Sequence, residues 1–203
     1  MASPVRITSQ ERSSARQRAL VVAAARLLID QGPGAVTHRA VAEAAGVPAG
    51  SANYYFPAKS QLYAEAVREA EEIRGSSALE MARALPQRNR SDSTTAILLI
   101  EVFYAPDLRV DVVPTRLEPM LAAYRDPDLR TIMMASRSRL LTALRITLES
   151  SGYHKVAAGP DVELLAQLID ASLIRAGLLG EKDPIVVAGL SVARLLELAQ
   201  QAR

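Results

Sequence analysis

The sequence predicts an all-α protein of about nine helices, in which a small N-terminal three-helix bundle precedes a larger helical domain. Ala, Leu, Arg and Glu dominate the chain, and apolar residues recur at helical rather than alternating spacing. No Asn-Gly or Asp-Gly pair, the usual signal of a hairpin turn, occurs. Hydrophobic residues make up 49% of the 203 positions, which is enough to build a folded core.

Start and stop signals divide the chain into a small domain at residues 11–57 and a larger one at 58–203, after a disordered tail at 1–10. In the small domain, Gly32-Pro33-Gly34 stops the first helix and Gly46 ends a short second helix. The stretch that follows has room for about two helical turns. Three helices of these lengths fit a small bundle.

The larger domain is expected to begin with a long helix that starts near Ala58, can bend at Gly75-Ser76-Ser77 and stops before Pro86. A polar loop follows at residues 87–93. The later helices are bounded by Asp92, Pro114, Asp126-Pro127 and Asp183-Pro184 at their starts and by Gly152 and Gly180 at their ends.

The basic charge of the chain is concentrated at its N-terminal end. The formal net charge is +2, yet residues 1–39 contain six Arg against Glu11 and Asp30. A basic N-terminal end on a chain whose other charges are balanced favours a polyanionic partner, although the same charge also fits an N-terminal arm exposed to solvent.

Composition argues against several other classes of protein. Without Cys the chain can form no disulfide or thiolate metal site, and the two histidines, His38 and His154, are too isolated for a zinc site. No apolar run reaches the ~18 residues of a membrane span, and the N-terminus lacks the apolar core of a secretory signal. We therefore expect a cytoplasmic protein without a cofactor, a metal or a membrane partner.

The segment at residues 37–56 has the pattern of a helix-turn-helix. Two short helices are joined by a tight turn at Gly46-Val47, and in this motif the second helix lies in the major groove of DNA. Small residues from Ala49 to Asn53 let the backbone approach the groove, while Ser and Asn offer hydrogen bonds to bases. The residues predicted to contact DNA are Thr37, Arg39, Ala49, Ser51, Asn53, Tyr54, Tyr55 and Lys59.

Three adjacent aromatic residues end this segment, and on a helix they cannot all share one face. We expect Phe56 to pack into the core, Tyr55 to be half-buried with its hydroxyl toward a phosphate, and Tyr54 to be the most exposed. The alternative, that all three belong to the core, fits poorly with their small and polar neighbours. Thr37 can cap its helix alone or also offer its amide to a phosphate, and Lys59 adds a charge at the start of the next helix.

The stretch from Arg16 to Leu62 resembles the N-terminal domain of the tetracycline-repressor (TetR) family of bacterial regulators. The matching features are the run from Ala23 to Leu28, Gly32, Thr37, Val41-Ala42, Ala45-Gly46-Val47, Gly50, Tyr55-Phe56, Lys59 and Leu62. Pro48 and Ala58 depart from the family, which often has a helix-capping Ser at both places. Asn53 stands where the family usually carries Tyr, so we expect an unusual operator sequence.

The larger domain shows no catalytic constellation. It has no Gly-x-Ser-x-Gly elbow, no phosphate-cradling Gly-rich loop and no His-Glu pair on one helix. Isolated acids such as Glu101 and Asp170 are more often exposed or paired than functional. The resemblance implies that this region binds a small effector, and the candidate lining residues, which also suit a core, are Phe103, Tyr104, Met120, Tyr124, Met133 and Met134.

The last two predicted helices, Asp161 to Leu179 and Pro184 to Leu198, carry apolar stripes wider than one buried face requires. We therefore expect each helix to pack on its own domain and on a second subunit, as the resemblance also implies. A single, well-buried monomeric bundle is the alternative. The predicted dimer-interface residues are Leu165, Ile169, Ser172, Ala176, Val186, Gly189, Leu190 and Ala193.

These observations predict a homodimeric transcriptional regulator, most simply a repressor, that binds palindromic double-stranded DNA and releases it when a small, largely apolar effector binds. An activator fits the same residues. Two other classes stay open: a helical enzyme, which would need a nucleophile or an acid–base pair that is not evident, and an interaction module that has lost DNA binding.

Overall fold

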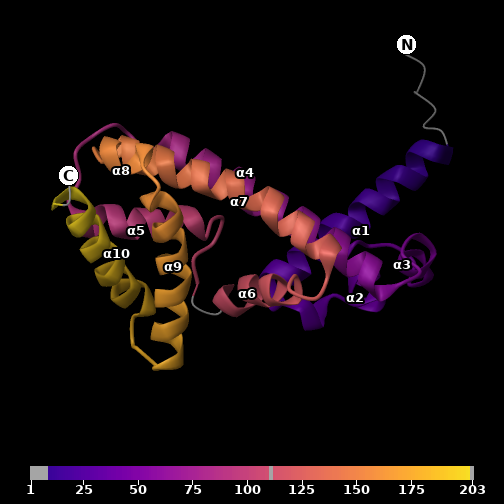
Figure 1. The fold of residues 1–203 in the computed structure, drawn as a ribbon. Helices are drawn as coiled ribbons and strands as arrows, with labels where there is room; N and C mark the ends of the chain where they lie inside the picture. Colours follow the sequence, from indigo (N-terminus) through magenta and orange to yellow (C-terminus); the bar gives the residue numbers. More distant parts are fainter. Residues whose placement is uncertain (1–8, 110–111, 202–203) are drawn as a thin grey trace, which may run out of the picture. The chain divides into compact units, whose positions relative to one another are not determined.

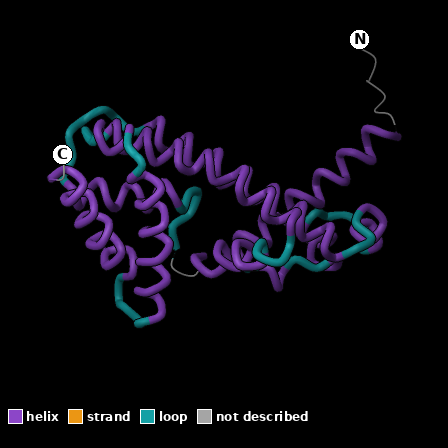
Figure 2. Tube along the Cα trace, viewed as in Figure 1, coloured by secondary structure: helices purple, strands orange, loops and turns teal. Residues whose placement is uncertain are grey.

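The computed structural model describes residues 9–109 and 112–201. Over these residues the chain forms ten α-helices and one 3₁₀ turn, without a strand, which confirms the predicted all-α class (Figures 1 and 2). The additional helix, compared with the expected nine, is α8 (His154–Ala158). It has only five residues, too few to show a periodic apolar pattern.

The first compact unit contains the described residues up to Ala70 together with Pro114–Arg130. Its helices are α1 (Ser9–Gln31), the turn η1 (Pro33–Ala35), α2 (His38–Ala44), α3 (Gly50–Tyr55), the first part of α4 (Lys59–Ala84) and most of α6 (Val112–Ala122). Helices α1, α2 and α3 pack on one another around a fully buried core that includes Leu20, Leu28 and Val41. The predicted three-helix bundle is therefore present.

The second compact unit contains Glu71–Val113 and the described residues from Thr131 onward. It is built from the rest of α4, α5 (Asp92–Phe103), most of α7 (Pro127–Ser150), α8, α9 (Asp161–Leu178) and α10 (Pro184–Gln201). Helix α10 packs against both α5 and α9 (Figure 1), where Leu99, Leu165 and Leu196 are fully buried. Among the described helices, none has the length and the apolar character to cross a membrane.

The compact units do not follow the functional division expected from the sequence. They separate within α4, between Ala70 and Glu71, whereas the predicted DNA-binding domain ends at residue 57. That functional boundary stays a prediction. Of the predicted tail, residues 1–8 lie outside the described part of the chain, and Ser9 and Gln10 begin α1.

Most predicted helix boundaries are confirmed by local hydrogen bonds. The Thr37 hydroxyl accepts from the Ala40 amide at 3.2 Å, and the Asp126 carboxylate accepts from the Asp128 amide at 2.9 Å. Gly152 and Gly180 adopt positive φ angles of 92° and 65° at the ends of α7 and α9.

Three expectations about the later helices need correction or refinement. Ser91, not Asp92, caps α5, because the Ser91 hydroxyl accepts from the Thr94 amide at 3.3 Å. Helix α6 begins at Val112, ahead of Pro114. Helix α4 continues without a break through Gly75 to Ala84.

A polar network in the second unit joins the loop before α5 to the end of α7. The Arg90 guanidinium donates to the carbonyl oxygens of Pro86 at 2.8 Å and Ser150 at 2.6 Å. The Tyr153 hydroxyl donates to the Asp92 carboxylate at 2.5 Å. Burial, and then this hydrogen bond to Asp92, raise the pKa of Tyr153 to about 12.

Candidate nucleic-acid interface

The turn between α2 and α3 is a closed helix C-cap. The Gly46 amide donates to the Glu43 carbonyl at 3.1 Å, and the Val47 amide donates to the Ala42 carbonyl at 3.0 Å. Gly46 has a φ of 65°, the left-handed conformation that this Schellman arrangement requires. The turn therefore sets the direction in which the chain enters α3.

Two buried side chains anchor helix α3 in the three-helix bundle. Ala52 is fully buried and Phe56 nearly so, which confirms the core position expected for Phe56. The His38 ring nitrogen Nε2 donates to the Phe56 carbonyl oxygen at 2.7 Å, since a carbonyl can only accept. This bond links the start of α2 to the end of α3.

The opposite face of α3 is open to solvent. Ala49 and Asn53 are exposed, Tyr54 is 79% exposed, and Ser51 is half-buried. The Tyr54 and Tyr55 rings meet edge to face, with centroids 5.1 Å apart. The predicted contrast between an outward Tyr54 and an inward Phe56 is therefore confirmed.

Tyr55 takes an intermediate position, as expected, and has a partner that the sequence did not reveal. It is half-buried, and its hydroxyl lies 3.0 Å from the hydroxyl of Ser13 on α1. This contact links α1 to the end of α3 across 42 residues of sequence. No local pattern could have identified it, because the two residues meet only when the bundle is formed.

Predicted cationic and capping residues surround α3. Arg39 on α2 and Lys59 at the start of α4 are exposed, and Thr37 is half-buried as the N-cap of α2. The departure at Ala58 has a local compensation, since the Ala58 amide donates to the Gln61 side-chain oxygen at 3.4 Å. Gln61 thus supplies one half of a capping box.

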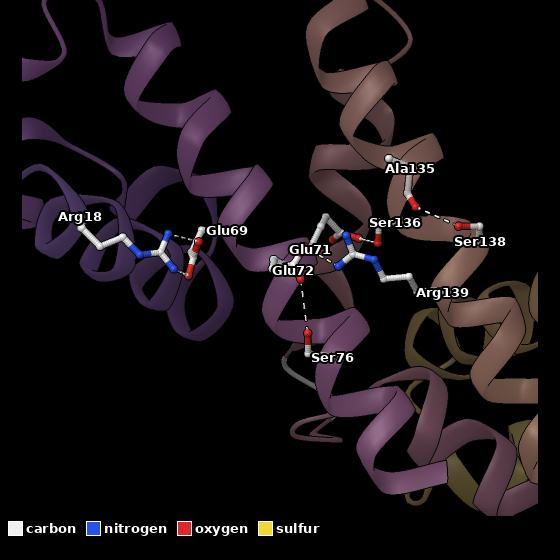
Figure 3. Close-up of polar contacts among 9 residues, drawn as sticks. All are labelled: Arg18, Glu69, Glu71, Glu72, Ser76, Ala135, Ser136, Ser138 and Arg139. Atoms are coloured by element: carbon white, nitrogen blue, oxygen red, sulfur yellow. Dashed lines mark hydrogen bonds and ion pairs between the residues drawn. The ribbon is translucent and has the colours of Figure 1, made fainter. Parts of the chain in front are cut away.

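An ion pair fixes α1 against α4 within the same unit. The Arg18 guanidinium donates to both carboxylate oxygens of Glu69, at 2.6 and 2.7 Å (Figure 3). A bidentate pair of this kind has a defined geometry. It positions the start of α4, which carries Lys59, relative to the bundle.

The six residues predicted to line a ligand site are divided between the two compact units. Phe103 and Tyr104 are buried in the second unit, whereas Met120 and Tyr124 belong to the first. Tyr124 and Met134 are largely exposed, and Met133 is half-buried. Only part of the set therefore lies inside the second unit, and the ligand site stays a prediction.

Tyr104 forms a polar contact with an acid that the sequence singled out. Its hydroxyl donates to the Asp170 carboxylate of α9 at 2.9 Å, and its ring meets that of Phe103 at a centroid distance of 5.9 Å. Asp170 is thus a paired acid at half burial. Glu101 is also half-buried.

The residues predicted for the dimer interface fall into two groups. Leu165, Ile169 and Ala176 have their side chains buried inside the protomer, and Gly189 is buried as well. Ser172 and Ala193 are half-buried, and Val186 and Leu190 are exposed. The sequence identified apolar stripes on α9 and α10, but it could not show which of their residues face the interior of the protomer and which face solvent.

The exposed apolar side chains on α9 and α10 include several that the prediction omitted. Leu164, Ile174, Leu178 and Leu198 were not among the predicted interface residues, whereas the exposed Val186 and Leu190 were. The packing of α10 against α5 and α9 determines which of these side chains stay exposed.

A tight C-capped turn, a short helix anchored by Ala52 and Phe56, and an open polar face define a helix-turn-helix regulator that binds DNA. Residues 20–66 match the family model of bacterial regulatory proteins, tetR family. The HTH-type transcriptional regulator BetI of Rhizobium meliloti (strain 1021) is 30% identical over 168 residues, which cover 80% of this chain and 78% of that protein. The chain therefore belongs to the tetR family of bacterial transcriptional regulators.

Solved structures share the fold along nearly the whole chain. The multidrug binding protein EbrR, complexed with proflavin, is 24% identical with a TM-score of 0.57, and the match covers 89% of this chain and 99% of that one. A transcriptional regulator from Saccharomonospora viridis in complex with choline is 20% identical with a TM-score of 0.60, over 93% of this chain and 95% of that one. At these identities the likeness concerns the fold.

Proposed function

We propose that the protein is a homodimeric repressor that binds a palindromic operator and leaves it when a small, largely apolar molecule binds the C-terminal part of the chain. The observation that carries the proposal is the two-sided character of α3. Ala52 and Phe56 hold the helix in the bundle, while Ala49, Asn53 and Tyr54 are exposed. An anchored helix with an open polar face is what a major groove can accept.

In this proposal the exposed residues have different tasks. Asn53 reads a base edge, since its amide can both donate to and accept from adenine. Arg39 reaches a base or a phosphate. Thr37, Tyr55 and Lys59 contact phosphates, which hold the protein on DNA of any sequence.

The exposed apolar residues of α9 and α10 support a dimer. Leu178 and Leu190 are among the most exposed large apolar side chains described, and burying them would remove apolar surface from water. A symmetric dimer would place the two α3 helices one DNA turn, about 34 Å, apart. The two-fold symmetry of such a dimer requires a palindromic operator.

The effector is proposed to bind among the helices of the second unit. Its interior is mostly apolar, and the Tyr104–Asp170 hydrogen bond supplies a polar anchor there. Similar structures were solved in complex with proflavin and with choline, which supports a small organic effector for this chain. Release would be a population shift, because the effector favours a conformation in which the reading helices do not fit the operator.

A salt series of DNA binding tests the proposal. The wild-type protein would be titrated against duplex DNA from the region upstream of its own gene and against a scrambled duplex of equal length. A specific reader prefers the first duplex, and its affinity falls with salt at a log–log slope of about −0.9 for each neutralised phosphate. Equal affinity for both duplexes would contradict the proposal and favour an interaction module without sequence-specific DNA binding.

A further inference from the structure

The N-terminal half of α1 carries arginines that are not among the predicted DNA contacts. Residues 9–19 contain three of them, against the single carboxylate of Glu11. Arg18 is held by Glu69, at 2.6 Å. Arg12 and Arg16 are exposed, and no described carboxylate forms an ion pair with either.

The hydroxyl pair of Ser13 and Tyr55 retains donor capacity for an external group. The two oxygens lie 3.0 Å apart, and either can be the donor of the bond between them. Two hydroxyls carry two protons, and their mutual bond uses one. One O–H group therefore stays available, and both side chains are half-buried rather than sealed.

Arg16 lies one helical turn after Ser13 on the same face of α1. Residues three apart on a helix are neighbours, and helical side chains lean toward the N-terminus. The Arg16 side chain is therefore directed along the helix toward the level of Ser13. A free O–H group and a guanidinium then lie close to the C-terminal end of α3.

We propose that Ser13, Arg16 and Tyr55 together bind one phosphodiester group of the DNA backbone. The inference rests on the proposed DNA-binding function and adds α1 to the contact surface. The cluster offers donors and a positive charge, and a phosphodiester offers only acceptors and a negative charge. DNA is favoured over an acidic protein because Tyr55 belongs to the same short helix as Asn53 and Tyr54.

The test compares Arg16→Gln with Arg26→Gln in the full-length protein. Both arginines are exposed on α1, and the two variants remove the same charge. Arg16→Gln should make the salt slope shallower by about 0.9 and weaken binding roughly tenfold, on upstream and scrambled DNA alike. Arg26→Gln should keep the wild-type slope, and circular dichroism melts should show both variants folded.

A shared phosphate also predicts that Ser13 and Arg16 are coupled in DNA binding. Ser13→Ala and Arg16→Gln should each weaken binding, and the double variant should lose less than the product of the two single losses. Multiplicative losses in that cycle would overturn the shared site.

The other outcomes separate this inference from the proposed function. An unchanged slope in Arg16→Gln, or equal changes in both variants, would overturn the inference and leave specific DNA binding intact. Wild-type protein without preference for upstream DNA would overturn the proposed function, while the slope on scrambled DNA would still decide the phosphate contact.

Discussion

Adjacent residues of α3 have opposite environments because a helix turns by about 100° per residue. Ala52 and Phe56, four positions apart, face the bundle and are buried, while Asn53 and Tyr54 face solvent. Tyr55 lies between these faces, which explains its half burial and its contact with Ser13. One short helix can therefore be anchored in the bundle and still present side chains to a DNA groove.

Asn53 is the position at which operator preference is expected to be set. Asn53→Ala should remove about 1–3 kcal/mol of discrimination at one base pair, because a bidentate contact to adenine is lost. Competition binding with single-base operator variants measures this. Lys59→Ala is the control and should weaken binding to every variant equally, as a phosphate contact does. Retained base preference in Asn53→Ala would show that another residue reads the base.

Tyr153 makes the stability of the second unit fall as the pH rises in the alkaline range. Its pKa rises from 10.0 to about 12 in the folded protein, so the folded state binds its proton more tightly than the unfolded state does. The stabilisation is complete below pH 10 and is lost as the pH rises through about 12.

The comparison with Tyr153→Phe isolates this effect from the other groups that titrate at high pH. The difference in unfolding free energy between wild type and variant should shrink across this pH range, as measured by urea unfolding at a series of pH values. A difference that stayed constant with pH would contradict the assignment.

At the scale of elements, the connection between α2 and α3 depends on one backbone conformation. Gly46 has a φ of 65°, and a Cβ added there would meet no atom within 4 Å. Gly46→Ala should therefore destabilise the protein only through the left-handed backbone, by about 1–2 kcal/mol. Gly50 has equal free space, and it lies at the start of α3 without a positive φ.

Gly50→Ala is the matched control for that substitution. It should leave thermal stability unchanged or raise it, by up to about 1 kcal/mol, because Ala favours the helix. Thermal melts of the two variants test the difference. Equal destabilisation would show that the turn does not depend on the conformation of Gly46.

Helix α4 is joined to α7 in the second unit by two neighbouring acids with different burial. Glu71 is 3% exposed and accepts from the Arg74 guanidinium at 2.8 Å. It also accepts from the Ser136 hydroxyl of α7 at 2.5 Å (Figure 3). The Glu72 side chain is 53% exposed and pairs with Arg139 of α7. The Glu71–Ser136 and Glu72–Arg139 contacts link the same two helices, but only the Glu71–Ser136 contact is shielded from water.

This pair of acids allows a direct comparison of buried and exposed charges. Glu71→Ala should cost about 3–5 kcal/mol, because it leaves the Arg74 charge buried with fewer partners. Glu72→Ala should cost about 0–1 kcal/mol, since an exposed ion pair is screened by water. Chemical denaturation gives both values. Similar costs would show that the site around Glu71 is hydrated.

At the scale of the whole molecule, the exposed apolar residues of α9 and α10 are expected to be covered by a second copy of the chain. Leu190→Glu should convert the dimer to a monomer, because a carboxylate would be buried in an apolar contact. Sedimentation velocity measures the change. Leu121→Glu on α6 is the control, since Leu121 is 67% exposed and Leu190 is 66% exposed. A monomeric wild type, or a dimeric Leu190→Glu, would contradict this interface.

Much of the fold could be predicted because helix ends are local. The cap at Thr37, the Asp-Pro starts of α7 and α10, and the glycine ends at Gly46 and Gly152 each depend on a few neighbouring residues. The contrast between Tyr54 and Phe56 was equally predictable from helical periodicity. The short helix α8 lacked enough residues to show a period.

The expected ligand and dimer residues depend on packing instead, and they stay predictions. An apolar side chain on α9 looks the same in sequence whether it faces α10 or solvent, so Leu165 and Leu164 could not be told apart. Likewise, Met120 and Met133 share their chemistry but belong to different compact units. Residue type alone did not indicate which neighbours they would have.

The sequence by itself determined the helical class, the helix-turn-helix and the inner and outer faces of α3, because these follow from periodicity and capping within a few residues. The tertiary structure decided which apolar positions on α9 and α10 are exposed, that Tyr104 pairs with Asp170, and that Ser13 meets Tyr55. These pairs are separated by 66 and 42 residues, and such contacts exist only once the helices have packed.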